Sequence, residues 1–228
     1  DSVTIDTEDP IIDSVDFESL YSYSPYAKPN DSVRLTFHAR DSGAGLASSP
    51  LVSIGGVWLD PSSITCTSGT MNDGIWEANY ILPDTLPQGD VSWEIRVTDG
   101  PGNEVTETGS GVILDKTAPE ISLVSFTTDN AIENSIGSKD HLLTLRFTVS
   151  DNGTGDSGLP ISFSPSVKFI QGTTEIPVTA VDDSGVWKAE RVFLESDSEG
   201  AWGFIVEASD RVGNTAQKTS TDTVLLDR

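Results

Sequence analysis

Short runs of alternating hydrophobic and polar residues recur along the whole chain. Residues 33–39 place Val, Leu, Phe and Ala at every second position, and residues 143–149 place Leu, Leu, Phe and Val in the same way. Residues 93–97 and 204–208 continue the pattern. A period of two predicts strands with one buried face, and no stretch has a helical period long enough to predict a helix. Strand-sized runs between Gly, Pro, Asn and Asp clusters predict an all-β chain.

The chain also repeats itself. When Trp76 is aligned with Trp187, the residues that coincide without a gap are Gly89 with Gly200, Asp99 with Asp210, Gly102 with Gly213 and Asn103 with Asn214. The offset is 111 residues here and 110 between Asp41 and Asp151. A period of this size is the length of one small domain rather than of a solenoid repeat. We therefore predict two tandem domains, at residues 1–115 and 116–228, with one tryptophan of the aligned pair in each core.

Four short motifs occur in order in this repeat. They are Asp-Lys-Thr-Ala-Pro at 115–119, a strand ending in Asp before a Gly-rich loop at 41–46 and 151–159, Gly-x-Trp at 74–76 and 185–187, and Asp-x-x-Gly-Asn at 99–103 and 210–214. Together they resemble the bacterial immunoglobulin-like repeats of large secreted adhesins. The resemblance covers nearly the whole chain, although residues 7–10 read Thr-Glu-Asp-Pro where the second copy has Lys-Thr-Ala-Pro. It implies two immunoglobulin-like antiparallel β-sandwiches at a cell surface, in a family that often binds Ca²⁺ near its linkers.

The beginning of the chain has two interpretations. Val3–Asp6 reads like Val112–Asp115 and Val224–Asp227, which end the two copies, and the step from Asp to the next Pro is the same at Asp6 and Asp115. Residues 1–9 are then the last strand of a preceding copy and its linker, and the chain is an excerpt. Alternatively, residues 3–6 are the first strand of the first copy.

Charge and cysteine content narrow the function classes. The chain has 36 acidic residues against 13 Lys and Arg, a net charge of −23. A protein needs a cationic face to bind nucleic acid or an anionic membrane surface, so neither is an expected partner of this chain. The single cysteine, Cys66, excludes an internal disulfide and a thiolate zinc cluster, and we expect it to be a small buried residue. No apolar run approaches the length of about 20 residues that a membrane helix needs.

Acidic residues stand at positions that an immunoglobulin-like topology brings to one pole, where the incoming chain, the B–C loop and the F–G loop meet. Candidate ligands are Asp9 (or Asp6), Asp41, Asp99 and Asn103 in the first copy, and Asp115, Asp151, Asp156, Asp210 and Asn214 in the second. Ca²⁺ prefers six to eight hard oxygen ligands of this kind. The sequence therefore predicts calcium at the domain junctions. The alternative is that these carboxylates only accept hydrogen bonds from turn amides.

Catalysis is not expected. His38 and His141 are the only imidazoles, they do not share a repeat position, and no nucleophile–base motif stands out. His38 lies at an outward position of its strand.

Four aromatic residues have no twin in the second copy, namely Tyr21, Tyr23, Tyr26 and Trp58. Flat aromatic faces suit sugar rings, so these are candidate ligand-binding residues; alternatively they cover a loop or a domain contact.

We therefore predict non-catalytic, extracellular stalk repeats of a bacterial surface adhesin, monomeric and stiffened at their junctions by calcium. Their partners would be neighbouring repeats, and possible ligands are a glycan or a host cell-surface protein. The alternative function is a glycan-binding accessory module of a secreted polysaccharide-degrading or proteolytic enzyme.

Overall fold

A computed structural model describes residues 6–221 and 223–227, so most of the segment 3–6 lies outside the described residues. The chain divides into two compact units, made mainly of residues 1–116 and 117–228. The described residues form strands and loops with one 3-10 turn, η1 (Pro61–Ser63). None of their helices is long and apolar enough to cross a membrane.

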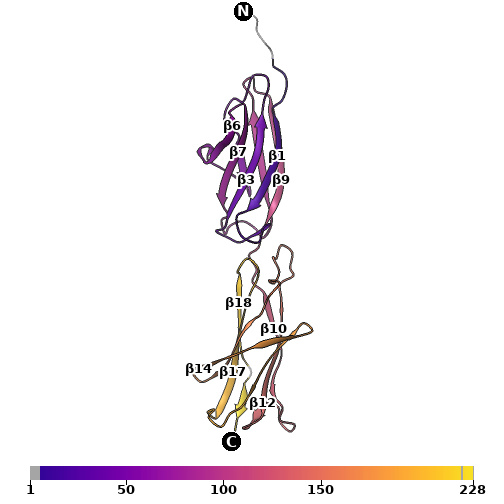
Figure 1. Ribbon diagram of the computed structural model, residues 1–228, viewed down its shortest axis with the longest axis vertical. Coiled ribbons are helices and arrows are strands. Elements are labelled where there is room, and N and C mark those ends of the chain that lie inside the picture. Colours follow the sequence, from indigo (N-terminus) through magenta and orange to yellow (C-terminus); the bar gives the residue numbers. More distant parts are fainter. Residues whose placement is uncertain (1–5, 222, 228) are drawn as a thin grey trace, which may run out of the picture. The chain divides into compact units, whose positions relative to one another are not determined.

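The first unit is a sandwich of two sheets (Figure 1). One sheet has the order β1 (Ile11–Ser19), β3 (Ser32–Arg40), β7 (Asp73–Ile81), β6 (Ile64–Thr70). The other has the order β2 (Tyr26–Ala27), β9 (Glu104–Leu114), β8 (Gly89–Thr98), β4 (Leu51–Ile54), β5 (Val57–Trp58). Neighbouring strands are antiparallel except for the short β2, which runs parallel to β9.

The second unit repeats this order. Its first sheet consists of β10 (Glu120–Thr128), β12 (Leu142–Ser150), β16 (Val186–Val192) and β15 (Ala180–Asp183). Its second sheet consists of β11 (Ile136–Gly137), β19 (Val224–Leu226), β17 (Gly200–Ser209), β13 (Ser166–Gln171) and β14 (Thr174–Val178), and β18 (Thr215–Thr219) also pairs with β17. The predicted all-β sandwich is confirmed in both units.

The alternating residues form the two cores as predicted. In β3 the side chains of Val33, Leu35, Phe37 and Ala39 are completely buried, while the residues between them face outward. Trp76 is buried in the core of the first unit. Its counterpart Trp187 is only partly buried, and it packs edge-on against the ring of Phe163 at 5.6 Å. Phe163 belongs to the B–C loop of the second copy, between β12 and β13, which is longer than the loop between β3 and β4 in the first copy.

Cys66 contradicts the prediction of a buried residue, because it is exposed. It lies in β6, an edge strand whose residues after Ile64 are all exposed. The register between β6 and β7 shifts between Cys66 and Ser68, so the strand loses the regular alternation that would turn one face inward. Its thiol lies against backbone oxygens, 3.3 Å from that of Ser68.

Candidate cation-binding site

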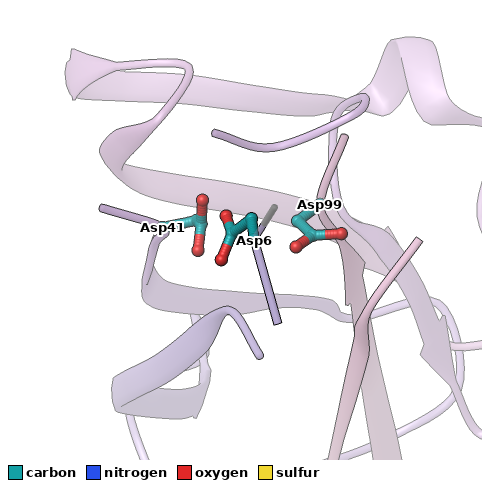
Figure 2. A group of neighbouring side chains, drawn as sticks. All are labelled: Asp6, Asp41 and Asp99. Carbon is teal, nitrogen blue, oxygen red and sulfur yellow. The ribbon is translucent and has the colours of Figure 1, made fainter. Parts of the chain in front are cut away.

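Three carboxylates of the first unit converge where the chain enters the sandwich. Figure 2 shows Asp6 between Asp41 and Asp99, and one carboxylate oxygen of each lies within 4.8 Å of the other two. Asp41 and Asp99 are 9% and 1% exposed, and Asp6 is half-buried. They come from three separate segments: the chain before β1, the loop after β3 and the turn between β8 and β9.

Asp41 is oriented by the loop that it begins. Its Oδ2 accepts backbone N–H groups from Gly43 at 3.2 Å and Gly45 at 2.6 Å. Gly45 has a φ of +77°, a conformation that glycine adopts without steric cost. Asn72, in the turn between β6 and β7, holds both ends of this loop. The Asn72 backbone carbonyl accepts a hydrogen bond from Asp41 N, and the Asn72 side-chain Oδ1 accepts one from Leu46 N.

Asp99 is fixed by the Asp-x-x-Gly-Asn turn. Its Oδ1 accepts from the backbone N–H groups of Gly102 at 2.7 Å and Asn103 at 2.6 Å, and its Oδ2 accepts from the Asn103 side-chain amide at 2.7 Å. Gly102 has a φ of +101°, as expected for a glycine that closes a tight turn. The motif therefore encodes both the turn and the position of one carboxylate.

Asp6 is held by both of these loops. Its Oδ2 accepts from Ala44 N at 2.6 Å, and its Oδ1 accepts from Glu8 N at 3.1 Å. The Asn103 amide also donates to the carbonyl of Glu8 at 3.2 Å and to that of Asp6 at 3.5 Å. The segment before β1 is thus fastened to the loop after β3 through Ala44 and to the turn between β8 and β9 through Asn103.

The electrostatics of the three acids favour a cation. Backbone amides stabilise each carboxylate, yet among the described residues no Lys, Arg or His forms an ion pair with any of the three. Two like charges about 4 Å apart repel by roughly 1–4 kcal/mol, depending on the local dielectric. The donor set consists of hard oxygens only, which is the ligand chemistry of Ca²⁺.

The second unit has a similar group. Asp151 and Asp210 are both buried, and a carboxylate oxygen of one lies within 4.8 Å of a carboxylate oxygen of the other. Asp115 precedes this unit in the sequence as Asp6 precedes the first. Asp210 repeats the turn of the first copy, since its Oδ1 accepts from Asn214 N at 2.8 Å and its Oδ2 from the Asn214 amide at 2.7 Å. The same amide donates to the carbonyl of Thr117 at 3.3 Å, as Asn103 does to that of Glu8.

Two predicted candidates lie outside these groups. Asp9 is exposed and lines a small cavity of about 120 Å³ beside Arg40 and Asp73, so Asp6 rather than Asp9 joins the first group. Asp156 is a half-buried residue of the long loop after Asp151 and belongs to neither group.

Asn103 and Asn214 lie beside the carboxylates as hydrogen-bond donors. Their side-chain amide nitrogens face Asp99 and Asp210, so each contact orients an acid rather than adding an oxygen to the group.

The unmatched aromatic residues do not form one surface. The rings of Tyr21 and Tyr23 are 6.2 Å apart, with the Lys28 ammonium 6.0 Å from the Tyr21 ring, and Tyr26 begins β2. Trp58 lies on β5, where its ring is 5.1 Å from the Arg96 guanidinium. The tyrosines and Trp58 are therefore separate features.

An Asp–His–Asp arrangement on the first sheet was not predicted from the sequence. His38 Nδ1 lies 2.9 Å from Asp13 Oδ1, and its Nε2 lies 2.7 Å from Asp73 Oδ1. The three residues stand on β1, β3 and β7, and Arg40 also approaches Asp13 at 3.5 Å. Both carboxylates raise the pKa of His38, most strongly through the hydrogen bond with Asp73. The outward position expected for His38 is confirmed.

No protein-family model matches the chain, and no curated protein sequence matches it. Among solved structures, a 1.5-MDa bacterial ice-binding adhesin aligns with 16% identity and a TM-score of 0.52 over 93% of this chain and 64% of that one. The fold is immunoglobulin-like. A Ca²⁺-stabilised adhesin of an Antarctic bacterium aligns with 17% identity and a TM-score of 0.46, over 97% of this chain and 49% of that one. The titin domains Z1 and Z2 align with 16% identity and a TM-score of 0.32, over 98% of both chains.

Proposed function

We propose that the chain is a pair of non-catalytic stalk repeats from an extracellular bacterial surface adhesin, with a calcium ion at the acidic group of each copy. The observation that carries this proposal is the convergence of Asp6, Asp41 and Asp99 in the first unit, together with the close approach of Asp151 and Asp210, which hold the repeat positions of Asp41 and Asp99 in the second. Turn capping alone requires one acid per loop, and it gives no reason for acids of separate loops to converge in both units.

The geometry suits calcium better than magnesium. Three carboxylates on loops can adapt to the six to eight oxygens that Ca²⁺ takes, with backbone carbonyls and waters completing the shell. Magnesium demands a near-ideal octahedron and gives up its waters reluctantly. A selective response to Ca²⁺ is therefore expected.

An ion at this position would act mechanically. Asp6 belongs to the incoming chain, whereas Asp41 and Asp99 belong to loops of the sandwich. A cation bound by all three would fasten the incoming segment to the domain, and Asp115 has the same position in the sequence before the second copy. Because like-charge repulsion opposes that arrangement without the ion, calcium would stiffen each entry point along a stalk of such repeats.

Thermal unfolding tests the ion. We expect the melting temperature to rise from EDTA to millimolar Ca²⁺ at matched ionic strength, and to rise much less in Mg²⁺. Asp6→Asn removes the most exposed of the three ligands and should reduce the Ca²⁺ response. Asp60→Asn is the matched control, because Asp60 also accepts a backbone N–H, from Ser62 at 2.8 Å, but lies outside both groups. Equal responses of both variants would contradict calcium at this group.

Backbone ¹⁵N relaxation tests the mechanical role. Two domains joined by a flexible linker tumble partly independently, whereas a stiffened pair tumbles as one body. Calcium should therefore lengthen the rotational correlation times of both units and bring them together. Unchanged correlation times with a clear rise in melting temperature would leave a stabilising ion and contradict the stiffened stalk.

A further inference from the structure

One row of residues crosses the outer face of the second sheet of the first unit. Trp58 on β5 is opposite Ser53 on β4, Ser53 is opposite Glu94 on β8, and Glu94 is opposite Thr108 on β9. Directly opposite residues in an antiparallel pair share a face. At about 4.8 Å per strand spacing, the row extends about 14 Å from an indole ring through a hydroxyl and a carboxylate to a second hydroxyl.

The row borders a groove. A depression of about 420 Å³ is lined by Ser53, Glu94 and Thr108 of the row and by Ser92, Ser110, Gly56, Trp93 and Gly109. Ser92 and Ser110 are opposite each other in the adjacent row. Trp93 and Gly109 are opposite each other, and Trp93 packs against the core, so these two residues belong to the inner face and border the groove with their backbone. Ser53 itself is only 5% exposed, whereas Ser92, Thr108 and Ser110 are exposed, so the groove presents three hydroxyl groups and the carboxylate of Glu94.

The indole of Trp58 is exposed and also held in place. Arg96 lies 5.1 Å from the centre of the Trp58 ring, and its guanidinium is directed by Glu94 at 3.0 Å and Glu104 at 3.6 Å. Because 47% of Trp58 remains exposed, Arg96 supports the ring without covering it. A ring oriented in advance loses little conformational entropy on binding a ligand.

This combination matches the chemistry of a sugar chain. The C–H face of a pyranose packs on an aromatic ring, and its hydroxyls both donate to a carboxylate and exchange hydrogen bonds with Ser and Thr. The groove also selects by charge. Arg96 is neutralised by two glutamates, and the chain carries a net charge of −23, so sulfated or uronic acid chains would be repelled. The expected ligand class is therefore an uncharged glycan.

The second unit shows that this site is an addition to the shared fold. In the corresponding row, Pro177 and Ile205 stand where the first unit has Trp58 and Glu94, on either side of Lys168. The groove on that sheet, about 590 Å³, is lined by Ser, Thr, Glu, Gln and Ala and has no aromatic residue. A residue needed only to build the sandwich would not be expected to change in this way between the copies.

We propose that the outer face of β5, β4, β8 and β9 in the first unit binds a neutral glycan, with Trp58 as the stacking platform and Ser92, Glu94 and Thr108 as its polar contacts. This activity is additional to the stalk role and does not depend on calcium. It gives one repeat of a stalk a contact with polysaccharide along its side.

An NMR titration of the full chain tests the proposal. The probes are three neutral oligosaccharides, maltohexaose, cellohexaose and chitohexaose, and one anionic probe, a heparin hexasaccharide. We expect saturable shifts of the Trp58 indole N–H and of the Ser92, Glu94 and Thr108 amides with at least one neutral probe, and none with heparin. Trp58→Ala should abolish them. Thr108→Val, which keeps the shape of the side chain, should weaken binding about two- to tenfold through one lost hydrogen bond.

Tyr23→Ala is the matched control, because Tyr23 is an aromatic residue with the same 47% exposure at a separate place. It should bind as the unmodified chain does. The proposal is overturned if no neutral probe binds, if binding survives Trp58→Ala, or if heparin binds the row equally well. Shifts of the row that depend only on protein concentration would assign the face to a second copy of the chain instead. Repeating the titration in EDTA separates this result from the calcium proposal.

Discussion

At the scale of single residues, His38 shows how a surface side chain can join three strands. Both of its ring nitrogens face carboxylate oxygens, Asp13 Oδ1 on β1 and Asp73 Oδ1 on β7. A neutral imidazole has one N–H to donate, whereas the protonated ring has two. Only the charged form therefore satisfies both contacts, which is the structural reason for the raised pKa of His38.

This arrangement makes stability depend on pH. The folded-state pKa of His38 lies above its ordinary value of 6.5, so the folded state binds the proton more tightly. The contribution is complete below about pH 6.5 and is lost as the pH rises through the raised pKa. The unfolding free energy of the chain should therefore exceed that of His38→Gln by more near pH 6 than near pH 9.

Urea unfolding at several pH values in EDTA measures this difference. Asp73→Asn removes one of the two facing carboxylates, and it should reduce the pH dependence while leaving His38 in place. At the acid end a second limb is expected, because His38 holds the pKa of Asp13 below its ordinary 3.8, and that contribution is lost as the pH falls through the lowered value. A pH-independent difference between the chain and His38→Gln would contradict the role of His38.

At the scale of elements, the sequence predicts strands better than contacts. The alternation that marked residues 33–39 and 143–149 lies in β3 and β12, because half-buried strands in a sandwich impose a period of two. The Asp-x-x-Gly-Asn turns were equally readable, since Gly102 and Gly213 both have positive φ. The prediction that Cys66 is buried was wrong, because Cys66 lies on an edge strand with a register shift, and such a strand does not turn every second residue into the core.

The acidic group was also predicted only in part, because the sequence predicts strands and turns but not the contacts between distant segments. Topology alone brings Asp41 and Asp99 to one pole, but the choice of Asp6 over Asp9 depends on how the chain enters the first strand. The contacts of His38 with Asp13 and Asp73 depend on strand register, and no local pattern in the sequence encodes it.

The loop that carries Asp41 should be sensitive to a single methyl group. Gly45 and Gly56 have almost the same positive φ, +77° and +79°. A Cβ at Gly45 would lie 2.6 Å from the Asn72 side chain, whereas nothing lies within 4 Å of one at Gly56. Gly56→Ala should thus cost only the backbone strain, about 1–2 kcal/mol, and Gly45→Ala should cost more because Asn72 must move. Equilibrium denaturation measures both, and equal losses would show that Asn72 does not fasten the loop.

The turn before β17 in the second unit contains a nearly buried ion pair. Arg191 contacts both oxygens of Asp197, at 2.6 and 2.7 Å, and also lies over the ring of Trp202. The two charged side chains are 15% and 8% exposed. Asp197→Asn leaves the Arg191 charge without its counter-ion, which typically costs about 3–5 kcal/mol. Amide hydrogen exchange in the second unit measures this loss of unfolding free energy. Glu175→Gln, at the exposed ion pair with Lys168, is the control, and its unfolding free energy should remain close to that of the unmodified chain.

At the scale of the whole molecule, the two copies separate what the fold requires from what each domain adds. The acidic group and its Asp–Asn turn occur in both copies, at Asp99 with Asn103 and at Asp210 with Asn214. Trp58 occurs in one copy only. A repeated feature fits the stalk role proposed for both copies, and an unrepeated one fits the recognition proposed for a single place along the chain.

The net charge of −23 gives the last prediction, because calcium and simple salt should act on it differently. Salt shortens the Debye length from about 30 Å at 0.01 M to about 10 Å at 0.1 M, and so weakens repulsion between exposed acids over the whole surface. The melting temperature in EDTA should therefore rise with NaCl.

Asp99, Asp151 and Asp210 are buried, and salt screens buried charges much less. Calcium should accordingly add a further rise that persists at high salt, and thermal scans across NaCl concentrations with EDTA, Mg²⁺ or Ca²⁺ measure both terms. If the Ca²⁺ increment disappears at high salt, the acids act as a solvated coat, and the convergence of carboxylates in each unit reflects turn capping alone.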